Sequence, residues 1–341
     1  MELMPVRVCN RLARGKAARR LLQSYLHSLD RHAYGYAIRS KQTERKIAKL
    51  KCAPNFVLHI FSSFAPFWTS ANIPYAMYLD YTMALARREW PPWAKFRNDH
   101  QYLSWLKVET RSYEQAAVLF TMGDNAKRSL VLDYGIPKDK IHVIGSAGSF
   151  ELLYEGKKTF GTRRILFYGS EFERKGGDIL LSAFRLVRQR IPDAELIIIG
   201  TTLEIKEPGV CMLGYVGSRE AMSELFLQSD LVVAPARCEP FTTFVIEAMN
   251  YGVPCIVTRA SGISETITDG VNGVLVGRLE PDDVADAIIT LLQSAPLLER
   301  ISANGRRLVS ARLNWDVVAA SIAAELPRYV DFTAYSAWNK K

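Results

Sequence analysis

Short apolar runs alternate with amphipathic stretches along the 341-residue chain. In the carboxyl-terminal half, the apolar runs predict six strands, and the stretches between them predict helices that are clearest at residues 177–190 and 282–293. This alternation is typical of parallel sheets with crossover helices, so we expect an α/β fold with a complete Rossmann-like unit. The predicted strands are residues 164–169, 195–199, 211–215, 231–235, 254–258 and 273–276.

The amino-terminal half shows the same pattern less clearly. Its apolar runs predict strands at residues 56–61, 74–79, 117–121 and 141–144. Between the last two strands, Asp124 is expected to cap a helix that ends at Gly135. The segment Val6–Cys9 would form a first strand, but it is a poor one.

The length of the chain suits two domains. Residues 155–161 are polar, contain glycine and show no periodicity, which is typical of a linker. We therefore expect a first domain at residues 1–155, a hinge at 156–163 and a second domain at 164–310, followed by a carboxyl-terminal segment at 311–341.

Charge is concentrated at the amino end. Residues 1–50 hold twelve Lys and Arg against three acidic residues, which accounts for the whole net charge of +9. A basic stretch with interleaved leucines predicts attraction to an anionic membrane surface, at about 1 kcal/mol per cation, and the alternative of a solvated helix face stays open. No aromatic interleaving or nucleic-acid motif accompanies the charges, so nucleic acid is not an expected partner. The basic residues of this stretch are Arg11, Arg14, Lys16, Arg19 and Arg20, and the leucines are Leu12, Leu21, Leu22 and Leu26.

The cysteine pattern indicates a reducing compartment. The five cysteines are scattered and include no CxxC pair, so neither a zinc site nor a disulfide framework is expected. No apolar run approaches the roughly 18 to 20 residues of a membrane helix, and the start lacks the apolar core of a signal peptide. We expect a cytoplasmic protein that is peripheral at the inner membrane face if the basic stretch binds lipid.

Two carboxylates mark the candidate site. Glu239 and Glu247 lie eight positions apart, after the predicted strand 231–235 and before Gly252, which ends a predicted helix. Glu239 therefore lies near the carboxyl end of a parallel strand and Glu247 lies within the next helix. Open α/β sheets bind ligands at this edge.

An ordered series of motifs surrounds this pair. Upstream, Ile165–Gly169 is followed by Arg174-Lys175-Gly176-Gly177. The segment as a whole, over roughly residues 115 to 320, resembles the retaining nucleotide-sugar glycosyltransferases of the GT-B fold, known as glycosyltransferase family 4 or glycosyl transferases group 1. The matching motifs are Glu239-Pro240-Phe241, Glu247-Ala248, Gly252-Val253-Pro254, Ser261-Gly262-Ile263-Ser264-Glu265 and Asp269-Gly270-Val271-Asn272-Gly273.

The resemblance implies two Rossmann-like domains whose parallel sheets face across a cleft. Residues 1–155 would form the acceptor side, 164–310 would bind the nucleotide sugar, and 311–341, with Trp315 in its helix, would return to the first domain. The implied reaction moves a hexose from a nucleotide diphosphate sugar to a carbohydrate or lipid-linked saccharide acceptor. Two alternatives remain: a non-catalytic GT-B subunit or scaffold, and a GT-B epimerase.

The resemblance also implies roles for named residues. Glu247 would accept hydrogen bonds from the ribose hydroxyls, Glu239 would contact the transferred sugar, and Lys175 would neutralise the leaving diphosphate. Glu239 and Lys175 are thus the expected catalytic residues. The expected donor-binding residues are Gly169, Ser170, Arg174, Phe241, Thr242, Thr243 and Glu247.

Some positions depart from the family pattern. Ser170 stands where the family commonly has an arginine, so Arg174 is the expected substitute, and Thr242 replaces a glycine, which either narrows donor choice or caps the helix. His59 and Asp80 are weaker candidates for contacts with the acceptor or sugar. Because cations are available and no Asp-x-Asp pair occurs, no catalytic metal and no cofactor is expected.

Overall fold

The structure is a computed structural model that describes residues 32–69 and 73–330. The predicted strand at residues 6–9 and the basic stretch at 11–26 lie outside these ranges. The chain divides into two compact units, and no helix of the described residues is long and apolar enough to cross a membrane. Unit 1 comprises the described residues of Met1–Phe120, Ser129–His142 and Arg328–Lys341, and unit 2 comprises Thr121–Arg128 and Val143–Pro327.

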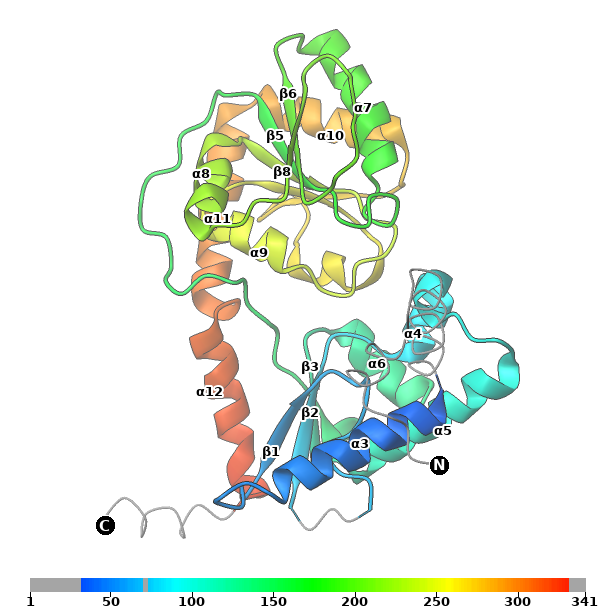
Figure 1. The fold of residues 1–341 in the computed structure, drawn as a ribbon. Helices are drawn as coiled ribbons and strands as arrows, with labels where there is room; N and C mark the ends of the chain where they lie inside the picture. The colour runs from blue at the N-terminus through cyan, green and yellow to red at the C-terminus, as the bar shows by residue number, and fades with distance from the viewer. Residues whose placement is uncertain (1–31, 70–72, 331–341) are drawn as a thin grey trace. The chain divides into compact units, whose positions relative to one another are not determined.

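Unit 2 is built on a six-stranded sheet with the order β10-β9-β8-β5-β6-β7. Figure 1 labels β5, β6 and β8 of this sheet. All of its strand pairs are parallel. The order reverses between β5 and β8, which makes the carboxyl ends of these two strands a topological switch point. The strands are β5 (Arg164–Tyr168), β6 (Glu195–Ile199), β7 (Val210–Gly214), β8 (Leu231–Ala234), β9 (Cys255–Thr258) and β10 (Val274–Val276).

The apolar runs of this sheet are continuous because both faces are covered. In β6, Leu196 and Ile198 join one hydrophobic cluster, while Ile197 and Ile199 join another on the opposite face. Helices α7 (Gly177–Arg190) and α10 (Pro281–Leu292) contribute to the first cluster. The second cluster is supplied by α8 (Arg219–Gln228), α9 (Thr243–Asn250) and α11 (Ala295–Arg312). This burial on both faces is the reason why strict alternation is missing from the sequence.

Three further elements complete unit 2. The 3₁₀ helix η3 (Ser261–Thr266) follows β9, and α12 (Trp315–Glu325) follows α11. Asn314 caps α12 by accepting a hydrogen bond from the amide of Val317. The short helix η4 (Leu326–Arg328) begins in unit 2 and ends at the first residue of the last unit 1 segment.

Unit 1 contains most of a four-stranded sheet with the order β1-β2-β3-β4. Strand β2 is completely buried, and its side chains Tyr75, Met77 and Leu79 pack with Leu119 and Leu130. The strands are β1 (Val57–Ile60), β2 (Tyr75–Leu79), β3 (Val118–Thr121) and β4 (Ile141–Val143). The helices are α3 (Ala33–Ile47), α4 (Met83–Glu89), η1 (Pro91–Ala94), α5 (Asp99–Gln115) and η2 (Lys138–Lys140). Helix α6 (Asp124–Leu132) begins in the unit 2 segment that ends at Arg128 and continues in unit 1.

The α/β fold class with two parallel sheets is confirmed. Each predicted strand within the described residues lies within one residue of an observed strand, and the predicted helices 177–190 and 282–293 correspond to α7 and α10. Asp124 is the first residue of α6 rather than the capping residue before it. The predicted domain boundaries at residues 155 and 310 stay predictions.

Candidate functional site at the carboxyl edge of the unit 2 sheet

Three loops that follow β5, β8 and β9 meet at the switch point. The amide of Arg237 donates to the carbonyl of Arg174 at 2.8 Å, and the amide of Ile263 donates to the carbonyl of Glu239 at 3.0 Å. These backbone hydrogen bonds join the loops directly to one another. Segments far apart in the sequence therefore form one structural unit around Glu239.

Two glycines permit this close approach. Gly176 has a φ of +74°, and a Cβ there would lie 1.9 Å from the carbonyl oxygen of Pro235. A Cβ at Gly262 would lie 1.9 Å from the carbonyl oxygen of Pro240. Because neither backbone carbonyl can tolerate such a contact, these positions require glycine.

The carboxylate of Glu239 lies between two cations. Its Oε2 is 2.9 Å from Nζ of Lys175 and 3.2 Å from Nη1 of Arg174. Arg174 also donates to the carbonyl oxygen of Cys238 at 2.6 Å and to the carboxylate of Glu171 at 2.9 Å. We call Glu171, Arg174, Lys175 and Glu239 the ion cluster.

Because the ion cluster is largely buried, an unpaired charge in it would be energetically costly. The side chains of Arg174, Glu239 and Lys175 are only 5%, 11% and 14% exposed. Burial opposes the charge of Arg174, but its hydrogen bonds and charge contacts with Glu171 and Glu239 outweigh this and raise its pKa. Removing one partner from such a group costs about 3 to 5 kcal/mol, since it leaves an uncompensated charge.

A second ion pair supports the same loops from behind. Arg237 binds Asp178 through two hydrogen bonds of 2.6 and 2.7 Å and also donates to the carbonyl of Glu173. Its guanidinium lowers the pKa of Asp178, which lies in the first turn of α7. Sequence reasoning missed Arg237, Asp178 and Glu171, because nothing local distinguishes them from solvated charges.

Glu247 lies on α9, as predicted from the sequence. Its Oε1 accepts a hydrogen bond of 2.9 Å from the amide of Ser149. The neighbouring Gly148 accepts one of 3.0 Å from Nε1 of Trp315. Within the described residues, the second carboxylate oxygen of Glu247 has no protein partner. The segment before β5 therefore holds the Glu247 carboxylate, and the start of α12 holds that segment. The sequence indicated only that Glu247 lies on a helix.

The remaining predicted donor residues border the same edge. Thr242 is buried and caps α9 by accepting a hydrogen bond from the amide of Val245 at 3.5 Å. Phe241 is half-buried and Thr243 is exposed at the start of the helix. The residues after β5 are a buried glycine, Gly169, whose amide donates to the carbonyl of Ile199 at 2.7 Å, and a half-buried serine, Ser170.

The two weaker candidates lie in unit 1, and the structure does not bring them together. His59 on β1 pairs in register with Met77 on β2, and Asp80 follows β2 three residues later. This offset corresponds to about 10 Å along the strands. Burial lowers the pKa of His59, whose Nε2 is buried without a hydrogen-bond partner in the described residues.

Glu265, the last residue of the motif at 261–265, contacts a helix far away in the sequence. Its carboxylate accepts from the amides of Asp124 and Asn125 at 2.6 and 2.7 Å, so it caps α6 rather than η3. Burial raises its pKa. Glu265 also lines a pocket of about 240 Å³ in unit 2, together with Phe241 and Arg312.

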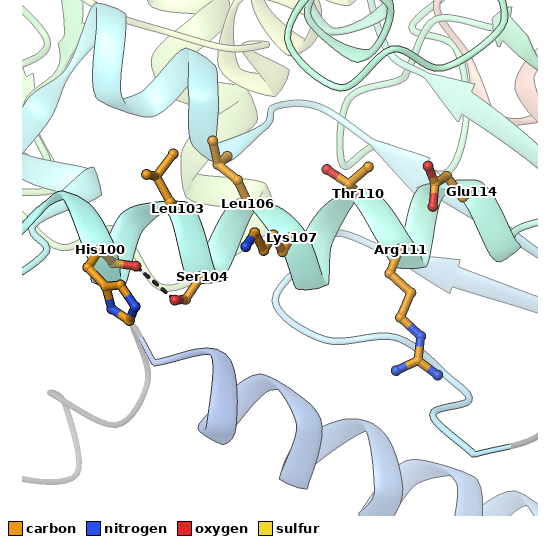
Figure 2. Close-up of a pocket in the computed structure, with 8 residues that line it drawn as sticks. All are labelled: His100, Leu103, Ser104, Leu106, Lys107, Thr110, Arg111 and Glu114. Atoms are coloured by element: carbon orange, nitrogen blue, oxygen red, sulfur yellow. Dashed lines mark hydrogen bonds between the residues drawn. The ribbon is translucent and has the colours of Figure 1, made fainter.

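Another pocket, of about 380 Å³, lies on one face of α5 in unit 1 (Figure 2). Its lining runs from His100 to Glu114, and Ser104 donates to the carbonyl of His100 at 2.8 Å. None of the predicted site residues lines this pocket. Among the described residues, no group of three His, Cys, Asp or Glu side chains is arranged to hold a metal ion.

The two parallel sheets, one of them doubly wound with its loops gathered at the switch point, give the chain a GT-B-like fold. The family model for glycosyl transferases group 1 matches residues 155–308, the part that carries these loops. Residues 155–308 therefore form a domain of the glycosyl transferases group 1 family.

Comparisons with individual proteins agree with this class. An uncharacterized glycosyltransferase of Methanocaldococcus jannaschii is 24% identical over 82% of this chain and 77% of its own length. The chain spans about half of the length of the next curated relatives. Among solved structures, sucrose-phosphate synthase from Thermosynechococcus elongatus has a TM-score of 0.67 at 17% identity, over 87% of this chain and 78% of that one. Anabaena HepE, in complex with UDP and glucose, has a TM-score of 0.59 at 21% identity, over 75% of this chain and 72% of that one.

The glycine contacts lead to a prediction about stability. In Gly262→Ala, the new methyl group must displace the carbonyl of Pro240, so we expect a loss of about 1 to 3 kcal/mol in the free energy of unfolding. Urea titration followed by circular dichroism measures this loss. Gly277→Ala is the matched control, because a Cβ at Gly277 meets nothing within 4 Å. Equal free energies of unfolding for the two variants would contradict the prediction, because they would mean that the Pro240 carbonyl can move aside without destabilising the fold.

Proposed function

We propose that the chain is a retaining hexosyltransferase that moves a hexose from a nucleotide diphosphate sugar to a sugar-containing acceptor. The observation that carries this proposal is the buried ion cluster at the switch point, where two cations share one carboxylate. A diphosphate needs cations at this position, and a sugar ring with positive charge developing at C1 needs a carboxylate. The UDP and glucose in the HepE complex support a hexose donor of this kind.

In the proposed reaction, the bond between C1 of the hexose and the diphosphate oxygen breaks, and the electron pair leaves with the nucleoside diphosphate. A bond from C1 to the acceptor oxygen forms on the same face. The acceptor hydroxyl gives its proton to the leaving phosphate. No side chain is assigned as a covalent nucleophile.

Each donor group would be bound by a different part of unit 2. Arg174 and Lys175 would turn from Glu239 to the diphosphate, which then carries the negative charge that the cations require. The first amides of α9, at Thr242 and Thr243 with Phe241 before them, would donate to the same phosphates. Gly169 and Ser170 would allow the donor to approach the end of β5.

The two glutamates would have separate tasks. Glu247 would bind both ribose hydroxyls, for which its second oxygen is available beside the bond to Ser149. Glu239, once released from the cations, would accept hydrogen bonds from the sugar hydroxyls and stabilise the developing charge. His59 and Asp80 remain candidates for acceptor contacts.

The test of this function is donor turnover with UDP-, GDP- and ADP-linked hexoses. Wild-type protein should release nucleoside diphosphate from one of them, and Lys175→Ala should lower turnover about a hundred- to thousandfold with the fold intact. Lys157→Ala, an exposed lysine of the same unit, is the control. A Lys175→Ala variant that keeps more than a tenth of wild-type turnover would remove Lys175 from the mechanism. Donor binding without any turnover would favour the non-catalytic subunit.

Calorimetry separates the two glutamates. Glu247→Ala should weaken binding of the free nucleoside diphosphate by about 1 to 3 kcal/mol, because charged hydrogen bonds to the ribose are lost. Glu239→Ala should not weaken it, because Arg174 and Lys175 lose a competing partner, yet transfer should fall. Glu224→Ala on α8 serves as an exposed control. Equal losses of affinity for the Glu239 and Glu247 variants contradict this division.

We further propose that the basic amino end docks the protein on an anionic membrane, where a lipid-linked acceptor is presented. This proposal rests on the sequence, in which residues 51–341 carry no net charge and cannot supply the attraction. Wild-type protein should sediment with anionic vesicles at low salt and not with neutral vesicles, and salt should release it. Replacing Arg11, Arg14, Lys16, Arg19 and Arg20 by Gln should abolish sedimentation. Wild-type protein that stays in the supernatant with anionic vesicles at low salt supports a solvated basic face.

A further inference from the structure

A buried carboxylate in unit 1 takes no part in the mechanism above. Glu109 lies on the inner face of α5 and is 1% exposed. The opposite face of the same helix forms the pocket shown in Figure 2. A carboxylate in such a position is costly unless its hydrogen bonds are well made.

Groups from different elements donate hydrogen bonds to Glu109. Ser62, in the loop after β1, donates through Oγ at 3.1 Å, and Tyr134, after α6, donates through its hydroxyl at 2.6 Å. The backbone amide of Met83, the first residue of α4, is another donor. One side chain therefore connects the segments that follow β1 and β2.

The start of α4 depends on the same network. The hydroxyl of Tyr134 accepts from the amide of Ala84 at 3.1 Å, and Thr82 accepts from the amide of Leu85 at 3.2 Å. Thr82 is in turn 2.6 Å from the hydroxyl of Ser129 on α6. The first three amides of the helix are thus satisfied by buried side chains, two of them through Glu109 or its direct partner.

The position of these loops connects the network with acceptor binding. Because β1 and β2 are parallel, their carboxyl ends lie at one edge of the sheet. Ser62 is three residues after His59, and Met83 is three residues after Asp80. His59 and Asp80, the two weaker acceptor candidates, therefore lie near the ends of β1 and β2, and Glu109 holds the segment that follows each strand.

We propose that Glu109 is a positioning residue that fixes the acceptor edge of unit 1 by holding the segments after β1 and β2 at the same time. The assignment of this edge to the acceptor rests on the proposed function, whereas the positioning of the two segments by Glu109 does not. Glu109 would touch neither donor nor acceptor.

The network responds to pH. Burial raises the pKa of Glu109 to about 6, because its donors are neutral and no cation pairs with it in the part of the chain that the structure describes. The other titratable groups that face it are hydroxyls: Tyr102 and Tyr113 on α5, Tyr36 on α3, and Tyr134 after α6.

The direction of the pH effect follows from linkage. The packed form binds the Glu109 proton more tightly than an opened form with an ordinary pKa of 4.5. The proton therefore stabilises the packed loops below about pH 4.5, and this stabilisation is lost as pH rises through about 6. Between pH 5 and 7.5 the equilibrium constant for opening should rise about eightfold.

Hydrogen exchange followed by mass spectrometry tests the positioning without any substrate. The exchange rate of each wild-type peptide is divided by the rate of the same peptide in Glu109→Gln, which does not titrate. For the peptides covering residues 61–69 and 80–90, this ratio should be about eightfold higher at pH 7.5 than at pH 5. Ser62→Ala should speed exchange in 61–69 only, and Tyr134→Phe should do so in 80–90 only. Because Ser62→Ala and Tyr134→Phe each remove a single hydroxyl, their exchange rates test the positioning even if Glu109→Gln folds poorly. Glu114→Gln, an exposed residue of α5, is the control.

Kinetics connects the positioning with function. With octyl β-D-glucopyranoside as acceptor probe, Ser62→Ala and Tyr134→Phe should raise the KM for the glucoside at least fivefold and change the KM for the donor less than twofold. Exchange rates within twofold of wild type in both peptides would overturn the positioning role. If exchange changes as expected but no donor is turned over, the positioning stands and the proposed function fails. If exchange changes and the glucoside KM does not, Glu109 is only a structural residue.

Discussion

The structure of unit 2 depends on a single electrostatic constraint: two cations, Arg174 and Lys175, adjacent in the chain and largely shielded from water, share the carboxylate of Glu239. Burial makes each cation costly unless a negative charge is near, and here that charge comes from a loop more than sixty residues away. The reversal of strand order between β5 and β8 makes the contact possible. The close approach of Gly176 and Gly262 to neighbouring carbonyls keeps the loops together. Two adjacent, partly shielded cations that attract a carboxylate can also attract a diphosphate.

The two buried glutamates show how the same side chain is used in two ways. Glu239 lies between cations, so its negative charge stabilises its surroundings. Glu109 is bonded only to neutral donors, and burial raises its pKa to about 6. The first arrangement favours exchange of one anion for another, as ligand binding requires. The second favours exchange of a proton, and it makes the order of two loops dependent on pH.

The sequence predicted those features that are encoded locally. Continuous apolar runs marked the strands within one residue, and the spacing of Glu239 and Glu247 placed them after β8 and on α9. Features that depend on packing were not predictable. Glu109 occurs in a polar stretch of α5 and looks like any solvated residue, because Ser62, Met83 and Tyr134 approach it only in the folded unit. Glu171 and Arg237 were missed for the same reason.

This difference has a functional origin. A nucleoside diphosphate presents the same charges whatever sugar it carries, so one strand-loop-helix segment can supply most of its contacts and leaves a clear pattern in the sequence. An acceptor has no such constant group. In the proposed function, its binding edge would be formed by segments such as those after β1 and β2, which are held in this chain by a buried network rather than by a motif. If the proposed roles hold, substitutions in these segments would alter the choice of acceptor while Glu239, Arg174 and Lys175 keep the donor chemistry, because the two sets of contacts share no residue.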